Sequence, residues 1–495
     1  MSIKRSAGIL LPIASLPSPY GIGTLGKAAY DFVDFLEKSG QSWWQILPVG
    51  PTSYGDSPYQ SFSTFAGNPY FIDLDLLIKD NLLSKAEVEK FDWINDNPNY
   101  IDYEKIYNSR FEVLRLAVSR TKGRADFGFQ KFFLENQKWL SEYGLYMAVK
   151  AHFDMKSWLD WPDEDIRLHR PEAVERYSNE LKDEVLFYQY LQYLFYKQWN
   201  DLRTYAKEKG IGIIGDIPIY VALDSADVWS DPKQFQLDEK NCPKLVAGVP
   251  PDYFSKDGQL WGNPLYNWDF MKADGFGWWI RRIEGAQKLY DIIRIDHFRG
   301  FESYWAVPFG EKTAKKGTWV KGPGMDLVNV LKNWFWNIQF IAEDLGILTD
   351  DVRTLLKDST FPGMKVLEFA FDSKEPSDYL PYNYERNCVC YAGTHDNDTL
   401  KGWTMTASKE DLKFAKDFLG VKNDEDLVKA VLRAGLGSVA DLFVAQLQDY
   451  LELGPEARIN TPGTLGMNWH WRLPKEALTT ALAKEIKTMT TMYGR

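Results

Sequence analysis

The sequence is poor in cysteine and has no long apolar run. Its three cysteines are Cys242, Cys388 and Cys390, and the last two alternate within an apolar, strand-like stretch where they cannot easily pair. An odd and sparse cysteine count indicates a reducing compartment. No stretch is long enough to span a bilayer, and the apolar run near the start is too short for a signal peptide. We therefore expect a cytoplasmic protein with no membrane partner.

The sequence also lacks an excess of positive charge, since its net charge is −11. Proteins that bind nucleic acid normally show a basic patch and a high pI, so a nucleic-acid partner is not expected. A negative charge suits a protein that acts on neutral molecules, although many enzymes carry it for solubility alone. None of the five histidines has metal-ligand spacing with another histidine or a cysteine, so we expect no metal site.

Two Gly-x-Gly-x-x-Gly patterns lack the setting of a dinucleotide site. Residues 21–26 open a helix, but three prolines separate them from the preceding strand and prevent the tight turn that such a site needs. Residues 210–215 lead into a strand rather than a helix. A nicotinamide dehydrogenase therefore remains only a distant third hypothesis.

Short apolar strands alternate with helical patterns along most of the chain. Strands are expected at 7–11, 43–48, 212–217, 291–296, 339–343, 365–371, 389–394 and about 464–469. Helices are expected at about 27–39, 325–336, 349–358, 409–437 and 475–489. Eight strands separated by helices or insertions predict a (β/α)8 TIM barrel of the α/β class.

The barrel is expected to form a single catalytic domain over 1–495 that carries two insertions. Residues 50–205 contain helical patterns separated by proline-rich and charged turns, which predicts a helical insertion subdomain. Residues 218–290 form the second insertion, and within it 247–266 is a loop rich in glycine and proline. Aromatic residues make up 15% of the chain, and rings with a polar edge suit the faces and hydroxyl rims of sugars.

Four of the predicted strands end in a carboxylate. Asp216, Asp296, Glu343 and Asp396 follow the third, fourth, fifth and seventh strands. Side chains just past the C-terminal ends of barrel strands point into the active site. A glycosidase needs a carboxylate nucleophile, a carboxylic acid as proton donor and negative charge near an oxocarbenium-like transition state. Any one of the four could instead cap a following helix, but together they favour catalysis.

Around these carboxylates the sequence resembles the amylomaltases, or disproportionating enzymes, a 4-α-glucanotransferase family of the α-amylase clan. The motifs lie at 56–60, 215–221, 248–254, 258–266, 294–300 (Arg-Ile-Asp-His-Phe-Arg-Gly), 342–346 (Ala-Glu-Asp-Leu-Gly) and 393–397 (Gly-Thr-His-Asp-Asn). The resemblance implies a retaining transglycosylase that passes α-1,4-glucan segments between malto-oligosaccharides or starch-type glucans. It implies no metal and no organic cofactor.

The resemblance also implies a role for each acid. Asp296 would attack the anomeric carbon and form a glycosyl-enzyme ester. Glu343 would protonate the leaving oxygen and then deprotonate the acceptor hydroxyl, for which it must be protonated at rest. Asp396 would hold the 2- and 3-hydroxyls of the distorted glucose, and Arg294 would keep Asp296 ionised through a charge-assisted hydrogen bond.

Further residues are implied to contact the same glucose. His395 would hydrogen-bond it, Asp216 would bind its outer hydroxyl, and Tyr59 would stack on it, whereas without the resemblance Tyr59 would be assigned to the core. His297 either lines the cleft or packs inside the protein, and Asn460 would lie near the cleft.

The resemblance makes 247–266 a lid over the acceptor sugars, with Tyr253, Phe254, Gln259 and Trp261 as its contact residues. Such a lid would exclude water and prolong the life of the intermediate. Two alternatives stay open: an α-1,4-glucan hydrolase on the same barrel, and a non-catalytic carbohydrate-binding protein. The presence of all three catalytic acids argues against the second.

Overall fold

The computed structural model describes residues 3–53, 55–94, 96–121, 126–251, 255–346 and 348–495. In these residues eight parallel strands are hydrogen-bonded in the order β10–β11–β12–β1–β2–β3–β6–β9. Their bounds are β1 Ser6–Leu10, β2 Trp43–Gln45, β3 Gly212–Ile217, β6 Ile292–Ile295, β9 Gln339–Ala342, β10 Gly363–Val366, β11 Cys388–Tyr391 and β12 Leu442–Gln446. The Ala342 amide donates to the Pro362 carbonyl at 3.0 Å, so the two ends of the sheet meet. The prediction of a (β/α)8 barrel is confirmed.

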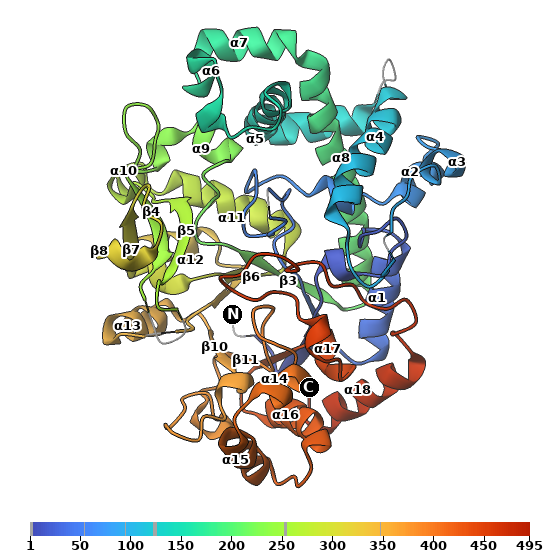
Figure 1. Ribbon diagram of the computed structural model, residues 1–495, viewed down its shortest axis with the longest axis vertical. Helices are drawn as coiled ribbons and strands as arrows, with labels where there is room; N and C mark the ends of the chain where they lie inside the picture. The colour runs from blue at the N-terminus through green and yellow to red at the C-terminus, as the bar shows by residue number, and fades with distance from the viewer. Residues whose placement is uncertain (1–2, 54, 95, 122–125, 252–254, 347) are drawn as a thin grey trace.

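Helices surround this barrel (Figure 1). They are α1 Lys27–Lys38, α11 Gly277–Leu289, α12 Met325–Trp334, α13 Asp350–Ser359, α14 Leu400–Thr406, α15 Lys409–Leu419, α16 Leu427–Gly437, α17 Leu447–Tyr450 and α18 Thr480–Met492. Helix α1 ends within one residue of the predicted range 27–39, and Gly40 follows it with a φ of 70° that side chains disfavour. No helix in the described ranges is long and apolar enough to cross a membrane.

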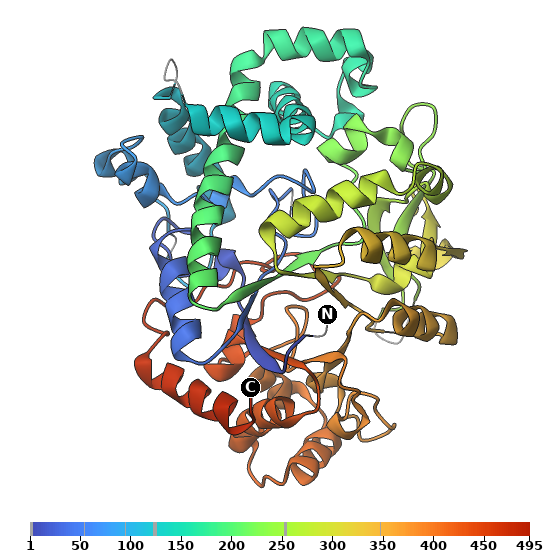
Figure 2. The same cartoon turned by 180° about the vertical axis from the view of Figure 1, so that it is seen from behind.

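Between β2 and β3 the chain is mainly helical and forms the upper part of the molecule in Figures 1 and 2. The helices are α2 Leu74–Lys79, α3 Lys85–Val88, α4 Tyr103–Ser119, α5 Phe127–His152, α6 Glu164–Arg167, α7 Pro171–Glu180 and α8 Lys182–Glu208. Helices α5 and α8 pack closely where Gly144 meets Gln189, since a Cβ at Gly144 would lie 2.8 Å from the Gln189 side chain. Tyr143 and Tyr146, which flank this part of α5, are both buried.

A second, antiparallel sheet lies beside the barrel, in the order β5–β4–β7–β8 (Figure 1). Its strands are β4 Leu245–Val249, β5 Gln259–Pro264, β7 Ser303–Pro308 and β8 Thr318–Lys321, and two short helices, α9 Ala226–Ser230 and α10 Trp268–Ala273, flank it. The glycine- and proline-rich residues 247–266 are therefore not a loop throughout. Their two ends pair as a β-hairpin, because Val246 and Gly248 lie opposite Pro264 and Leu260.

The prediction of the eighth strand at about 464–469 is wrong. The eighth barrel strand is β12, whose five residues are all buried, whereas Leu465 is 97% exposed. The predicted helix over 409–437 is two helices, because Gly420 takes a φ of 71° and ends α15. β12 is a buried strand of only five residues, four of them apolar, so it offers neither length nor alternation to identify it.

Candidate active site

The alternation of side chains along three barrel strands aims three charged groups inward. Asp216 on β3, Arg294 on β6 and Glu343 just after β9 each follow, by two residues, a side chain of the barrel interior. Those interior residues are Ile214, Ile292 and Ile341. Because side chains in a strand return to the same face every second residue, the charged groups share the inward face at the strand ends.

Arg294 connects two carboxylates at the mouth of the barrel. Its Nη1 donates to Asp216 Oδ2 at 2.6 Å and to Asp296 Oδ1 at 3.0 Å. Tyr59 Oη donates to the same oxygen of Asp216 at 2.8 Å. Burial opposes the charge of Arg294, but the attraction of Asp216 and Asp296 outweighs it, so the pKa of Arg294 is raised above its ordinary value. Arg294 is therefore a fixed cation against Asp296.

The Asp216 side chain lies below Asp296 and is 0% exposed. Its Oδ2 accepts from both Arg294 and Tyr59, while its Oδ1 is buried with no hydrogen-bond partner among the described residues. Asp216 thus holds Arg294 and Tyr59 in place, and the binding of an outer sugar hydroxyl by Asp216 stays a prediction. Asp216 still belongs to β3, whereas Asp296 has left β6 and its side chain is 30% exposed.

The carboxyl groups of Asp296 and Glu343 differ in pKa. Burial raises the pKa of Glu343 to about 8, and the charge of Asp296 adds to this, against the opposing effects of Arg294 and of two backbone amides. Those amides, of His297 and Leu345, donate to its two carboxyl oxygens at 2.8 and 2.6 Å. Burial raises the pKa of Asp296 only to about 6, because Arg294 favours its charged form. Near neutral pH, Asp296 is thus the anion and Glu343 the acid.

Asp396 lies in the loop after β11 and is the most open of the acids, with a side chain 46% exposed. Its Oδ1 accepts a hydrogen bond from Asn460 Nδ2 at 2.6 Å and lies 3.3 Å from His395 Nε2. Asn460 comes from the loop after β12. Two neighbouring loops therefore direct one carboxylate toward the cleft.

Aromatic rings form one wall beside these acids. Tyr59 stacks on His395 with ring centroids 5.2 Å apart and an angle of 18° between the planes. Trp469 lies 5.9 Å from Tyr59 and 6.0 Å from His395. Such a wall offers flat surface to a sugar ring next to the carboxylates.

A second aromatic pair involves the nucleophile loop and the hairpin. His297 meets the edge of Trp261 at 4.8 Å, and Trp261 Nε1 donates to Gln259 Oε1 at 3.2 Å. Burial lowers the pKa of His297 to about 3, so its ring is neutral. Tyr253 and Phe254 lie outside the described residues. Among the described residues, no group of histidines, cysteines and acids could hold a metal ion.

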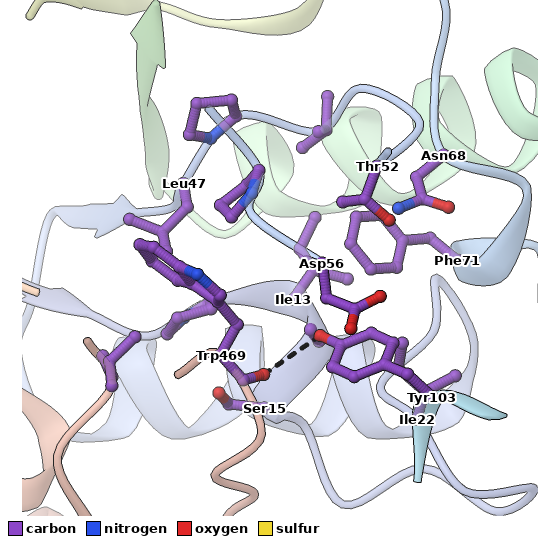
Figure 3. A pocket seen from close by; sticks show the side chains of 16 residues that line it. Ile13, Ser15, Ile22, Leu47, Thr52, Asp56, Asn68, Phe71, Tyr103 and Trp469 are labelled. Carbon is purple, nitrogen blue, oxygen red and sulfur yellow. Dashed lines mark hydrogen bonds between the residues drawn. The ribbon is translucent and has the colours of Figure 1, made fainter. Parts of the chain in front are cut away.

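A pocket adjoins the aromatic wall (Figure 3). Trp469 and Asp56 face into it, and Tyr103 Oη donates to the carbonyl oxygen of Trp469 at 3.0 Å. Trp469 has a φ of 70°, which is uncommon for a bulky residue. Helix α4 of the helical region thus helps to hold the wall in place.

Sequence reasoning missed three residues of this region. Trp469 was assigned to a strand that does not exist, and Glu368 was placed inside the strand predicted at 365–371, although β10 ends before it. The third is Arg458, whose neighbour Asn460 was identified. For Glu368 a signal was present, because it is an acid just past the sixth strand, as Asp296, Glu343 and Asp396 are past theirs.

The chain is similar to known proteins over nearly its whole length. Residues 11–479 match the family model for 4-alpha-glucanotransferase. The 4-alpha-glucanotransferase of Clostridium butyricum is 51% identical over 485 residues, which cover 98% of this chain and 99% of that protein. That of Thermus thermophilus is 44% identical over 488 residues, covering 96% and 95%.

Solved structures agree with this result. The amylomaltase from Streptococcus agalactiae, solved in complex with acarbose, matches with a TM-score of 0.96 and 42% identity, covering 99% of this chain and all of that one. The amylomaltase from Corynebacterium glutamicum, only 18% identical, shares the fold with a TM-score of 0.81 over 99% of this chain and 75% of its own.

Proposed function

The chain belongs to the 4-alpha-glucanotransferase family, and from this premise we propose that Asp296, Glu343 and Asp396 perform its chemistry. The enzyme transfers α-1,4-glucan segments between malto-oligosaccharides or starch-type glucans. One observation carries the assignment of roles: Asp296 is held as an anion by Arg294, and burial beside that anion favours the protonated form of Glu343. A nucleophile and a proton donor are the two carboxyl groups that a retaining glycosidase requires.

In the first step, a carboxylate oxygen of Asp296 attacks the anomeric carbon of the donor. The glycosidic bond breaks, and the proton of Glu343 moves to the leaving oxygen, which becomes the free 4-hydroxyl of the departing sugar. Asp396, directed by Asn460 and His395, faces the distorted ring and stabilises its developing positive charge. The product is a glucan joined to Asp296 as an ester.

In the second step, Glu343 is a carboxylate and takes the proton from the 4-hydroxyl of an acceptor sugar. The acceptor oxygen attacks the anomeric carbon and releases Asp296. Two inversions at one carbon retain the α configuration. No protons or electrons are gained overall, so the two carboxyl groups return to their starting states.

Transfer requires that a sugar rather than water resolves the ester. We assign this selectivity to the aromatic wall and to residues 247–266 as a cover, with Gln259 and Trp261 beside His297. Covering the site would exclude water and offer aromatic surface to the acceptor. We further propose that residues 1–495 form one catalytic barrel and that 50–205 and 218–290 are its insertions. We also propose that the protein is cytoplasmic, because its three free cysteines would stay reduced there.

Maltotriose alone should be converted into longer oligosaccharides together with glucose. Each transfer of a maltosyl unit releases one glucose and lengthens one acceptor, whereas hydrolysis produces only shorter sugars. Chromatography of the products over time measures this. Shorter products without any longer ones would favour the hydrolase alternative.

The pH dependence of kcat/KM should be bell-shaped. Activity should rise as pH passes the pKa of Asp296, about 6, because the nucleophile ionises. It should fall above the pKa of Glu343, about 8, because the acid loses its proton. Since the two groups interact, both limbs belong to the pair. Initial rates with maltotriose across this range measure the profile, and a rate that stays constant well above the upper limb would contradict the acid role of Glu343.

A further inference from the structure

Arg458 joins the two loops that carry Asp396 and Asn460. Its Nη2 donates to the backbone carbonyl of Asp396 at 2.7 Å, and its Nε donates to the backbone carbonyl of Asn460 at 2.8 Å. Asn460 Nδ2 closes the ring of contacts on Asp396 Oδ1 at 2.6 Å. One guanidinium group therefore sets the backbone from which both functional side chains project.

Behind Arg458 lies a group of acids at the ends of the last three barrel strands. Asp398 Oδ2 lies 3.9 Å from Arg458 Nη1, and the Asp449 carboxylate accepts from the Leu400 amide at 2.8 Å. Burial raises the pKa of Glu368 to about 8, with the charges of Asp449 and Asp398 adding to it. Burial likewise raises the pKa of Asp449 to about 7. Of these acids, Asp398 lies nearest to the guanidinium, and the charge of Arg458 opposes the rise in the pKa of Glu368.

The carboxylate of Asp396 depends on this support. Its side chain is half exposed, and Asn460 and His395 contact only its Oδ1, so its direction also depends on the position of its own backbone. That backbone is held through the carbonyl that Arg458 binds. Catalytic groups need support of this kind, because a shift of about 1 Å can cost on the order of 10²-fold in rate.

We propose that Arg458 is a positioning residue for the transfer reaction, acting by holding Asp396 and Asn460 in the geometry that stabilises the transition state. It touches no reacting atom. A planar fork of donors suits two carbonyls and a carboxylate in different directions, whereas a lysine offers a single flexible ammonium. The inference rests on the role given to Asp396 in the proposed function.

The test compares Arg458→Ala and Arg458→Lys with Arg5→Ala. Arg5 makes a similar clamp on the carbonyls of Leu436 and Ser438, but near the N-terminal ends of the strands, away from the site. We expect Arg458→Ala to lower kcat with maltotriose by about 10–100-fold with a smaller change in KM. Arg458→Lys should retain an intermediate kcat, and Arg5→Ala should lower Tm without lowering kcat. Equal kcat for all three variants and the unchanged enzyme would overturn the proposal.

A double-mutant cycle separates this inference from the proposed function. If Arg458 acts through Asp396, adding Arg458→Lys to Asp396→Asn should change kcat by about twofold or less. If the fold-loss in kcat of the double variant equalled the product of the losses in the two single variants, Arg458 would act independently of Asp396. That result would overturn the positioning role alone. A kcat for Asp396→Asn equal to that of the unchanged enzyme would instead overturn the role of Asp396, and the inference with it.

Discussion

Replacing Asp296 with asparagine should lower the rate of glucan transfer by about 10⁴–10⁶-fold, as removal of a nucleophile does in other covalent enzymes. The amide is similar in shape, and its oxygen can still accept the hydrogen bond from Arg294. It cannot form the ester, because the amide carries no negative charge and its oxygen is a poor nucleophile. Binding of maltotriose should remain measurable by calorimetry.

The matched control for this variant is Asp291→Asn. Asp291 stands just before β6, the strand that Asp296 follows, and its carboxylate accepts from the Ile213 amide and from Arg203 at the opposite end of the barrel. We expect Asp291→Asn to leave kcat unchanged and to lower Tm somewhat. If Asp296→Asn turned over maltotriose at the rate of the control, another residue would have to be the nucleophile.

The second large effect is expected for Glu343→Ala. Loss of general acid and base catalysis should lower kcat with maltotriose by about 10²–10⁴-fold. The loss should depend on the leaving group, because fluoride needs little help from a proton donor. With a malto-oligosaccharyl fluoride as donor, ester formation should recover, and its hydrolysis or transfer should become the slow step.

Azide tests directly whether Glu343→Ala lacks the general base. Azide carries no proton that a base must remove. In Glu343→Ala it should therefore attack the ester on Asp296 in place of the acceptor sugar and yield an α-glycosyl azide. Glu302→Gln is the control, since Glu302 pairs with the exposed Lys321 and should respond to neither reagent. The assignment of Glu343 would fail if Glu343→Ala lowered the rate with the fluoride donor by the same factor as it lowered the rate with maltotriose.

The acids at the strand ends could be predicted from the local sequence pattern alone. Seven of the eight strands were placed by short buried runs, and the alternation along β3, β6 and β9 then directs Asp216, Arg294 and Glu343 inward. These features depend only on the period of a strand and on parallel packing. They could therefore be predicted before any contact between distant residues was known.

Other features depend on contacts that no local pattern encodes. The strand β12 carries no signal that separates it from a buried helical turn, and it is identified by its pairing with β1 and β11. The burial of Asp216 depends on Arg294 and Tyr59, from two other parts of the chain. The link between Arg458 and Asp396 joins residues 62 positions apart.

By itself, the sequence determined the barrel, its strand-end acids and, through its resemblance to a family, the chemistry that they perform. Only the tertiary structure decided which acid is ionised and which is protonated, because burial and neighbouring charge set the pKa values of Asp296 and Glu343. It also decided which polar residues face the cleft and which support them from behind. The physical reason is that both properties arise from groups brought together across the fold, whereas strand alternation arises within a few residues.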